Sequence, residues 1–260
     1  MRIGLSTAAF YGRMETDDAA AHIARLGIPC CEVFLETFSE YDPSFGRSVK
    51  QRLGNTQAVS IHSKTQHFEG DILGLSMRQR EDAFAWMDSF LSTGEVLAAS
   101  VYVFHGPASI RTSNPDFGKW QKAIEKAISL AASHGIDFCW EVVSWCQLNS
   151  PERVRLFRSL WPDLHFVLDV KQVHELGQDP LDYVDAMGEK LRHVHILDHN
   201  DHGTHVLPGE GVNDYRAFAR ALKEKGYQGD IILEPYAHVV TSDEALLRSI
   251  DWLRETFGAQ

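Results

Sequence analysis

The feature that most restricts the fold of this chain is a regular alternation of two kinds of segment along its length. Short runs of β-branched and aromatic residues recur at intervals, and longer stretches with apolar residues at helical spacing lie between them. The strand-like runs are Arg2–Thr7, Cys31–Glu36, Gln57–His62, Ser100–His105, Asp137–Val143, Leu164–Val170, Arg192–Asp198 and Asp230–Tyr236.

The stretches between these runs carry the boundary signals of helices. Glycines follow several of them, including Gly27 after Glu15–Leu26, Gly135 after Asp116–Ser133 and Gly226 after Asp214–Lys225, as expected just beyond a helix C-terminus. Ser150 precedes Pro151, which is the pattern of an N-cap residue followed by proline in the first turn. Further helix-like stretches are 44–52, Ser76–Leu97 and Ser242–Phe257.

Strict alternation of strands and helices predicts a parallel sheet, because parallel neighbours must be joined by a crossover connection. Repeated through the 260 residues, this alternation fits a (β/α)8 TIM barrel of the α/β class, with residues 1–260 as a single domain. A doubly wound open sheet is the alternative, but the glycine-rich pattern expected after its first strand is missing.

The charge and cysteine content restrict the partners of the chain. Its 36 Asp and Glu outnumber 25 Lys and Arg, giving a net charge of −11, which argues against sequence-independent binding of nucleic acid. No apolar run approaches the roughly 18 residues of a membrane span, and no secretory signal is visible. The 4 cysteines form no CxxC pair. We therefore expect a cytoplasmic protein with reduced thiols and no membrane partner.

Successive strand-like runs from the third onward contain a histidine or an acidic residue at or near their ends. In a barrel these ends meet at one rim, where catalytic groups are found. Buried carboxylates and imidazoles are costly unless paired, and a divalent cation is one shared partner for them. Each residue taken alone is explained as well by a structural hydrogen bond, but separate explanations do not account for the whole series. The residues are His62, His105, Glu141, Asp169, His195 and Glu234.

The strand-end order of Glu141, Asp169, His195 and Glu234 resembles that of the xylose-isomerase-like TIM barrel superfamily. The most specific segments are Leu168–Gln172, His193–Asp198 and His205–Gly211, and the resemblance extends from Arg2 to Phe257. The superfamily includes sugar phosphate isomerases and epimerases, ketose 3-epimerases, hydroxypyruvate isomerases and inosose dehydratases. A more distant branch contains AP endonucleases of the endonuclease IV type.

The resemblance implies one divalent metal ion, Mn, Co, Mg or Zn, held by Glu141, Asp169, His195 and Glu234. In the nuclease branch these positions belong to a cluster of three zinc ions, extended by residues matching His62, His105 and His205. Two departures argue against the complete cluster. Gln172 stands where both branches tend to have histidine, and Gly203 stands where the nuclease has aspartate. The expectation is one metal ion, or two if His62 and His105 contribute.

The predicted function is that of a divalent-metal-dependent isomerase or epimerase of a sugar, sugar phosphate or sugar acid. Such an enzyme abstracts a proton next to a carbonyl through a metal-stabilised enediolate. Glu141 and Glu234 are the predicted catalytic pair. The predicted substrate-binding residues are His62, His105, Lys171, Gln172 and His205.

Three alternatives stay open at this point. The first is a zinc-dependent phosphodiesterase of the AP endonuclease type, and the second is a dehydratase, which begins with the same proton abstraction. The third is a non-catalytic barrel that binds a sugar or a partner. The expected partner is a small sugar, and a homo-oligomer is expected only from the family.

Overall fold

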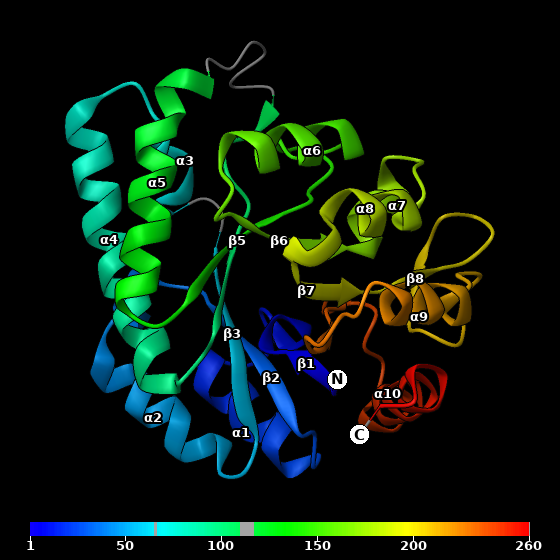
Figure 1. Ribbon diagram of the computed structural model, residues 1–260. Coiled ribbons are helices and arrows are strands. Elements are labelled where there is room, and N and C mark those ends of the chain that lie inside the picture. The colour runs from blue at the N-terminus through cyan, green and yellow to red at the C-terminus, as the bar shows by residue number, and fades with distance from the viewer. Residues whose placement is uncertain (65–66, 110–116, 260) are drawn as a thin grey trace.

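In the computed structural model the chain forms a closed barrel of parallel strands surrounded by helices (Figure 1). The structure describes residues 1–64, 67–109 and 117–259. Around the barrel the strands follow the order β1, β10, β7, β6, β5, β4, β3, β2. Their bounds are β1 Ile3–Ser6, β2 Cys30–Leu35, β3 Gln57–Ser63, β4 Val101–Phe104, β5 Asp137–Glu141, β6 His165–Asp169, β7 Leu191–Ile196 and β10 Ile231–Leu233. The predicted (β/α)8 barrel is confirmed.

The helices begin and end largely where local signals predict. Ser150 accepts a hydrogen bond from the backbone N–H of Arg153 at 3.2 Å and so caps α6. Asp116, the predicted first residue of a helix, lies outside the described residues. None of the helices in the described ranges has the length and apolar character needed to cross a membrane. The α-helices are α1 Thr16–Arg25, α2 Pro43–Leu53, α3 Glu69–Ile72, α4 Met77–Leu97, α5 Phe117–Ser133, α6 Pro151–Leu160, α7 Val170–Glu175, α8 Pro180–Met187, α9 Tyr215–Glu224 and α10 Asp243–Phe257, and the 3₁₀ turns are η1 Thr7–Phe10, η2 Phe38–Glu40 and η4 Gly188–Lys190.

The predicted runs extend beyond the strands at their C-terminal ends, except Gln57–His62, which stops one residue before the end of β3. His105 and Glu234 lie one residue past β4 and β10, where the chain leaves the sheet and turns toward the barrel mouth. Asp198 was predicted as the last residue of the seventh strand, but it begins a small antiparallel hairpin of β8 (Asp198–His199) and β9 (His205–Val206). Its carboxylate accepts hydrogen bonds from the backbone N–H groups of His199 and Asn213, which stabilises this hairpin and the loop that follows it.

On the side of β4, β5 and β6, an apolar layer lies below the polar mouth of the barrel. Val101, Val103, Cys139 and Val167 pack against one another, all almost fully buried. Side chains two residues apart on a strand share a face, so this layer lies directly under His105, Glu141 and Asp169. This apolar layer therefore supports the polar side chains above it.

Candidate active site

A cavity of about 300 Å³ opens at the mouth of the barrel. Polar side chains from the strand ends form its floor, and His195 lies beneath that floor, fully buried. Aromatic residues from the surrounding loops and strands form its walls, so the cavity has ionisable side chains at its bottom and apolar rings at its sides. The wall residues are Tyr11, Phe34, Trp145 and Tyr236.

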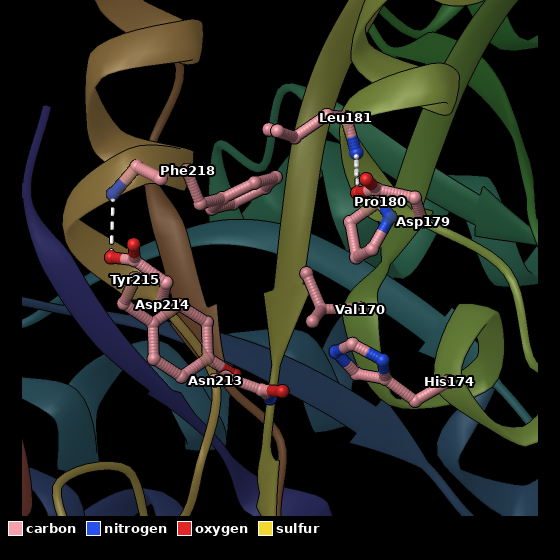
Figure 2. A pocket seen from close by; sticks show the side chains of 10 residues that line it. Val170, His174, Asp179, Pro180, Leu181, Asn213, Asp214, Tyr215 and Phe218 are labelled. Carbon is pink, nitrogen blue, oxygen red and sulfur yellow. Dashed lines mark hydrogen bonds between the residues drawn. The ribbon is translucent and has the colours of Figure 1, made fainter.

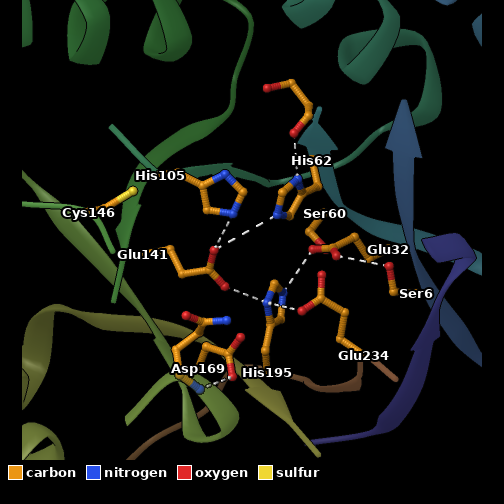
Figure 3. A network of polar contacts seen from close by, with 12 residues as sticks. Ser6, Glu32, Ser60, His62, His105, Glu141, Cys146, Asp169, His195 and Glu234 are labelled. Atoms are coloured by element: carbon orange, nitrogen blue, oxygen red, sulfur yellow. Dashed lines mark hydrogen bonds and ion pairs between the residues drawn. The ribbon is translucent and has the colours of Figure 1, made fainter. Parts of the chain in front are cut away.

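His195 is the centre of the polar network (Figure 3). Its Nδ1 atom lies 2.7 Å from Oε1 of Glu141 and 3.5 Å from Oε2 of Glu234, and its Nε2 lies 3.0 Å from Oε2 of Glu32. Burial opposes a charged imidazole, but the carboxylates of Glu32, Glu234 and Glu141 raise the pKa of His195 well above its ordinary value. In the absence of metal, carboxylates on both sides of the ring therefore favour its protonated form.

Glu32 is a buried carboxylate that the sequence did not single out. It lies on β2 and accepts hydrogen bonds from the hydroxyls of Ser6 and Ser60, at 3.1 and 2.9 Å, besides its contact with His195. Burial works against its charge, but His195 and His193 hold the pKa of Glu32 well below its ordinary value. The available signal was an acidic residue inside an otherwise apolar strand, which is costly without a buried partner.

His105 connects the mouth to a second buried carboxylate that the sequence did not single out, Glu69. Nε2 of His105 lies 2.8 Å from Oε2 of Glu141, and its backbone N–H donates to Oε2 of Glu69 at 3.1 Å. Glu69 also accepts from the hydroxyls of Ser63 and Tyr102. Burial opposes the charge, yet Glu141 raises the pKa of His105 to about 9. Glu69 follows a loop with no periodic pattern, so no sequence signal marked it.

His62 has one ring nitrogen bound to the backbone and the other directed toward Glu141. Its Nδ1 lies 2.9 Å from the carbonyl oxygen of Ser63, and because a carbonyl only accepts, Nδ1 carries a hydrogen. Its Nε2 lies 3.9 Å from Oε2 of Glu141. The His62 and His105 rings meet edge to face at 4.5 Å.

Asp169 and Lys171 lie side by side at the start of α7. Asp169 caps this helix, since its Oδ1 accepts from the backbone N–H of Gln172 at 3.2 Å. The ammonium Nζ of Lys171 lies 3.4 Å from Oδ2 of Asp169 and 3.1 Å from Oε2 of Glu234. Burial raises the pKa of Asp169 to about 7, although Lys171 opposes the shift.

Gln172 presents its amide nitrogen, not its oxygen, to the cavity that it lines. Its Oε1 accepts hydrogen bonds from the backbone N–H and the hydroxyl of Ser144, at 2.9 and 2.8 Å. A backbone N–H can only donate, so this contact fixes the orientation of the amide. Gln172 is therefore placed to donate to a bound molecule and is a poor metal ligand.

His205 is the predicted site residue that lies apart from the others. It is on β9 of the hairpin, where its Nε2 lies 3.6 Å from Oε1 of Glu175 and its ring lies 5.1 Å from that of Tyr236. It does not line the cavity. The hairpin places His205 at the rim, where it contacts Tyr236, and Tyr236 in turn lines the cavity.

The remaining predicted ligands are suited to hold a metal ion. One ligand atom from each of Glu141, Asp169, His195 and Glu234 lies within 4.8 Å of all the others. Three carboxylates and one imidazole form a donor set that suits Mn, Co, Mg or Zn. Glu32 holds Nε2 of His195, so Nδ1 is directed at the carboxylates, which is the usual support of a metal-bound histidine.

Two further groups of ligand-type residues adjoin this one. His62, His105 and Glu141 form a group at the mouth, and Glu32, His193 and His195 form another below it. His193 is buried, with Nε2 3.8 Å from Oε2 of Glu32. Glu141 and His195 each belong to two groups, so the polar floor is one continuous network.

A second cavity, of about 200 Å³, lies between α7, α8 and α9 on the outside of the barrel (Figure 2). It also contains a histidine and two aspartates. Asp179 accepts from the backbone N–H of Leu181 and Asp214 from that of Ala217, both at 2.9 Å, so each caps a helix. Burial lowers the pKa of His174 to about 4, and its ring lies 4.6 Å from that of His199.

The sequence model of the family described as xylose isomerase-like TIM barrel matches residues 20–256. The chain belongs to this family. Its match therefore covers all of the strands except β1 and all of the polar floor except Ser6, since both lie before residue 20.

Two curated relatives match shorter segments. The fructoselysine 3-epimerase of Escherichia coli O157:H7 is 34% identical over 28% of this chain and 27% of its own length. The inosose dehydratase of Lacticaseibacillus casei is 27% identical over 38% of this chain and 36% of its own length. The matches thus span about a quarter to a third of these relatives.

Solved structures match over the whole barrel. The D-psicose 3-epimerase of Clostridium cellulolyticum H10, solved with D-tagatose, superposes with a TM-score of 0.80 and covers 99% of both chains at 17% sequence identity. At this identity the likeness establishes the shared barrel fold.

Proposed function

We propose that the protein is a divalent-metal-dependent isomerase or epimerase of a sugar, sugar phosphate or sugar acid. The observation that carries the proposal is the convergence of Glu141, Asp169, His195 and Glu234 within 4.8 Å at the floor of a cavity. The curated relatives, an epimerase and a dehydratase of polyhydroxylated compounds, support chemistry at a carbon next to a carbonyl.

A metal ion held by these four residues would act as a Lewis acid on the substrate carbonyl and acidify the neighbouring carbon, an effect worth several kcal/mol. Glu141 is the proposed base. Burial opposes its charge, but contacts from His195 at 2.7 Å and His105 at 2.8 Å hold the pKa of Glu141 well below its ordinary value. Glu141 is thus kept as a carboxylate, which is the form that accepts a proton.

Glu234 is the proposed second acid–base group. It directly follows the eighth barrel strand, β10, which β6 and β7 separate from the strand β5 of Glu141 in the closed sheet. Both carboxylates approach the same Nδ1 atom of His195, from different sides in Figure 3. A carbon bound between them would have one carboxylate toward each face, which is the arrangement that inversion of a stereocentre requires. General acid–base catalysis of this kind contributes about 10²–10⁴-fold.

The polar groups around the carboxylates suit the hydroxyls of a sugar. The ring of His62, the amide of Gln172, which is a donor, and the ammonium of Lys171, also a donor, all line the cavity. Trp145 and Tyr11 line the walls with rings that are about half exposed. Such rings pack on the C–H faces of sugars while the hydroxyls bind to the polar floor.

Exchange of a substrate proton with solvent tests this proposal. The protein, loaded with Mn²⁺, Co²⁺, Mg²⁺ or Zn²⁺ in turn, is incubated in deuterium oxide with ketoses, ketose phosphates and keto acids, and deuterium at carbon is followed by NMR. We expect metal-dependent incorporation into at least one compound. Glu141→Gln should keep the metal and lose at least 10³-fold of the exchange rate, which is the scale of one catalytic base.

A matched control separates this loss from a general effect of removing a carboxylate. Glu189→Gln makes the same change at an exposed ion pair with Arg158 and should leave exchange unchanged. No exchange with any compound and any metal, or equal losses in the two variants, would contradict the proposal.

The second candidate function is a zinc phosphodiesterase of the AP endonuclease type. The group formed by His62, His105 and Glu141 favours it, since these residues could hold a second ion. His205 lies outside the ligand groups of the described residues, and the oxygen of Gln172 is bound to Ser144, so support for a third ion is lacking. Two or three tightly bound zinc ions with cleavage of abasic DNA would favour this function; one ion without cleavage would exclude it.

The sequence expectations of a cytoplasmic location and a homo-oligomer are kept here as proposals. Fractionation of cells and light scattering of the purified protein test them. A non-catalytic role would require Glu141 to be dispensable, which the exchange experiment decides.

A further inference from the structure

We propose that the ammonium group of Lys171 is a built-in cation of the site formed by Glu141, Asp169 and Glu234. In the absence of metal it holds Asp169 and Glu234 together, and it competes with a divalent ion for the same carboxylate oxygens. The inference rests on the proposed function, since it concerns the metal ion named there. It concerns the affinity of that ion and not the chemical step, so the two can fail separately.

The first argument is the position of the ammonium group. Nζ of Lys171 lies 3.1 Å from Oε2 of Glu234 and 3.4 Å from Oδ2 of Asp169. These carboxylates come from β10 and β6, which are not neighbours in the barrel, so the lysine bridges two strand ends across β7. The side chain is only 6% exposed and its charge is therefore weakly screened by solvent.

The second argument is that both oxygens of Asp169 already have a partner. Its Oδ1 accepts the backbone N–H of Gln172 as the cap of α7, and its Oδ2 faces Lys171. A metal ion bound through Oδ2 would therefore share that oxygen with the lysine or displace it. Two cations on one oxygen repel strongly in a buried site, so metal binding and the lysine contact oppose one another.

The third argument is charge. The three carboxylates Glu141, Asp169 and Glu234 carry three negative charges when ionised, and a divalent ion compensates two of them. The ammonium of Lys171 is a further positive charge beside two of these carboxylates, in addition to the histidines that contact Glu141. With the lysine present, the ion enters a site whose net attraction is weaker by one charge than that of the carboxylates alone.

The fourth argument is that the lysine already has a further stabilising contact besides those with the carboxylates. Its Nζ lies 4.5 Å from the centre of the Tyr236 ring, which lines the same cavity. A cation over an aromatic face is stabilised by about 0.5–2 kcal/mol, and lysine is a flexible chain. A small rotation away from Asp169 and toward Tyr236 would release the oxygen and keep the charge inside the site.

The consequence is a site built for reversible binding of metal. In the metal-free protein the lysine keeps the carboxylates in place and prevents their mutual repulsion. The organised site is thus present before the ion arrives, and its affinity for the ion is reduced in return. Removing the positive charge should strengthen metal binding, whereas removing a residue that only supports the fold should weaken it.

Titration with Mn²⁺ alone, by calorimetry and by competition with a chelator, tests the inference. We expect Lys171→Met and Lys171→Gln to bind Mn²⁺ at least tenfold more tightly than the original protein. The metal-free variants should melt at lower temperature and gain more from added Mn²⁺. Gln keeps a hydrogen-bond donor and serves if Met fails to fold. Lys225→Met is the matched control, because it removes the same charge from an exposed contact with Asp185, and its affinity should not change.

The outcomes separate the inference from the proposed function. Equal or weaker Mn²⁺ binding by both Lys171 variants would overturn the inference and leave a metal-dependent enzyme standing. Absence of Mn²⁺ binding by every protein in the series would overturn the proposed metal dependence itself. A tenfold gain shared by Lys225→Met would assign the effect to net charge and would also overturn the inference.

Discussion

The cavity at the barrel mouth and the cavity between α7, α8 and α9 contain similar residue types and differ in what those residues already bind. In the outer cavity both aspartates cap helices through backbone N–H groups, which cannot be displaced without unfolding a turn. At the mouth the carboxylates of Glu141 and Glu234 face imidazole and ammonium groups, which can lose a proton or move. Whether the acidic residues of a pocket can bind a ligand therefore depends on the groups that they already contact.

The two cavities also shift the pKa of histidine in opposite directions. His105 at the mouth is surrounded by carboxylates, and its pKa is raised to about 9 despite burial. His174 in the outer cavity has another histidine beside it, and burial lowers its pKa to about 4. The surroundings of His105 therefore favour its charged form, whereas those of His174 disfavour it.

Among variants that compare the two cavities, the largest expected effect comes from the aspartates, which cap helices in both regions. Serine also caps helices, so Asp169→Ser and Asp214→Ser each keep the cap and remove the carboxylate. We expect Asp169→Ser to lose at least 10²-fold in Mn²⁺ affinity and in solvent exchange of the substrate proton. Asp214→Ser should lose neither, and equal effects of the two variants would remove the distinction between the cavities.

Removing Glu32 should give the next largest effect. Outer carboxylates that orient a metal-bound histidine typically contribute 10–100-fold to metal affinity. We expect Glu32→Ala to lose that factor in Mn²⁺ affinity, because Nε2 of His195 loses its partner. Glu32→Gln keeps an acceptor oxygen and should lose less. A loss of folding without a change in affinity of the folded fraction would mean that Glu32 acts only on stability.

The barrel was predictable from sequence because its signals are local. Gly27 lies just after α1 and Pro151 begins α6, and strand-end residues such as His62 and Asp169 meet at one rim in any parallel barrel. Glu32 was missed because its partner His195 lies 163 residues away and meets it only across the barrel interior. His205 lies apart from the cavity because a hairpin inside a loop, which no periodicity marks, turns it toward Glu175.

The opposite pKa shifts predict opposite effects of pH on the stability of the metal-free protein. The raised pKa of His105 gives stability that is complete below pH 6.5 and is lost as the pH rises through about 9. Between pH 7.5 and 9.5 the original protein should lose about 2 kcal/mol more than His105→Gln, or about 5 °C in melting temperature.

The lowered pKa of His174 gives stability that is present above pH 6.5 and is lost as the pH falls through about 4. His174→Gln should therefore reduce the loss of stability between pH 6.5 and 4, and by less than the effect at His105, because His174 is half-exposed. Calorimetric melting of both variants across pH 4–9.5 measures the two effects together. Shifts of the same sign would contradict the charge difference between the cavities.

The smallest expected effect is loss of a helix cap in the outer cavity. Asp214→Ala removes the acceptor of the Ala217 N–H and should cost about 1 kcal/mol, or about 3 °C in melting temperature. Proton exchange and Mn²⁺ affinity should remain those of the original protein. A measurable loss of exchange would show that the outer cavity takes part in the reaction.

Anomalous diffraction from a crystal soaked in MnCl₂ tests most directly whether the mouth is the reactive region. The account predicts a manganese peak at the barrel mouth within coordination distance of Nδ1 of His195 and of the carboxylates of Glu141, Asp169 and Glu234, with Nζ of Lys171 moved toward Tyr236. A peak in the outer cavity, or a mouth without manganese at a saturating concentration, would contradict it.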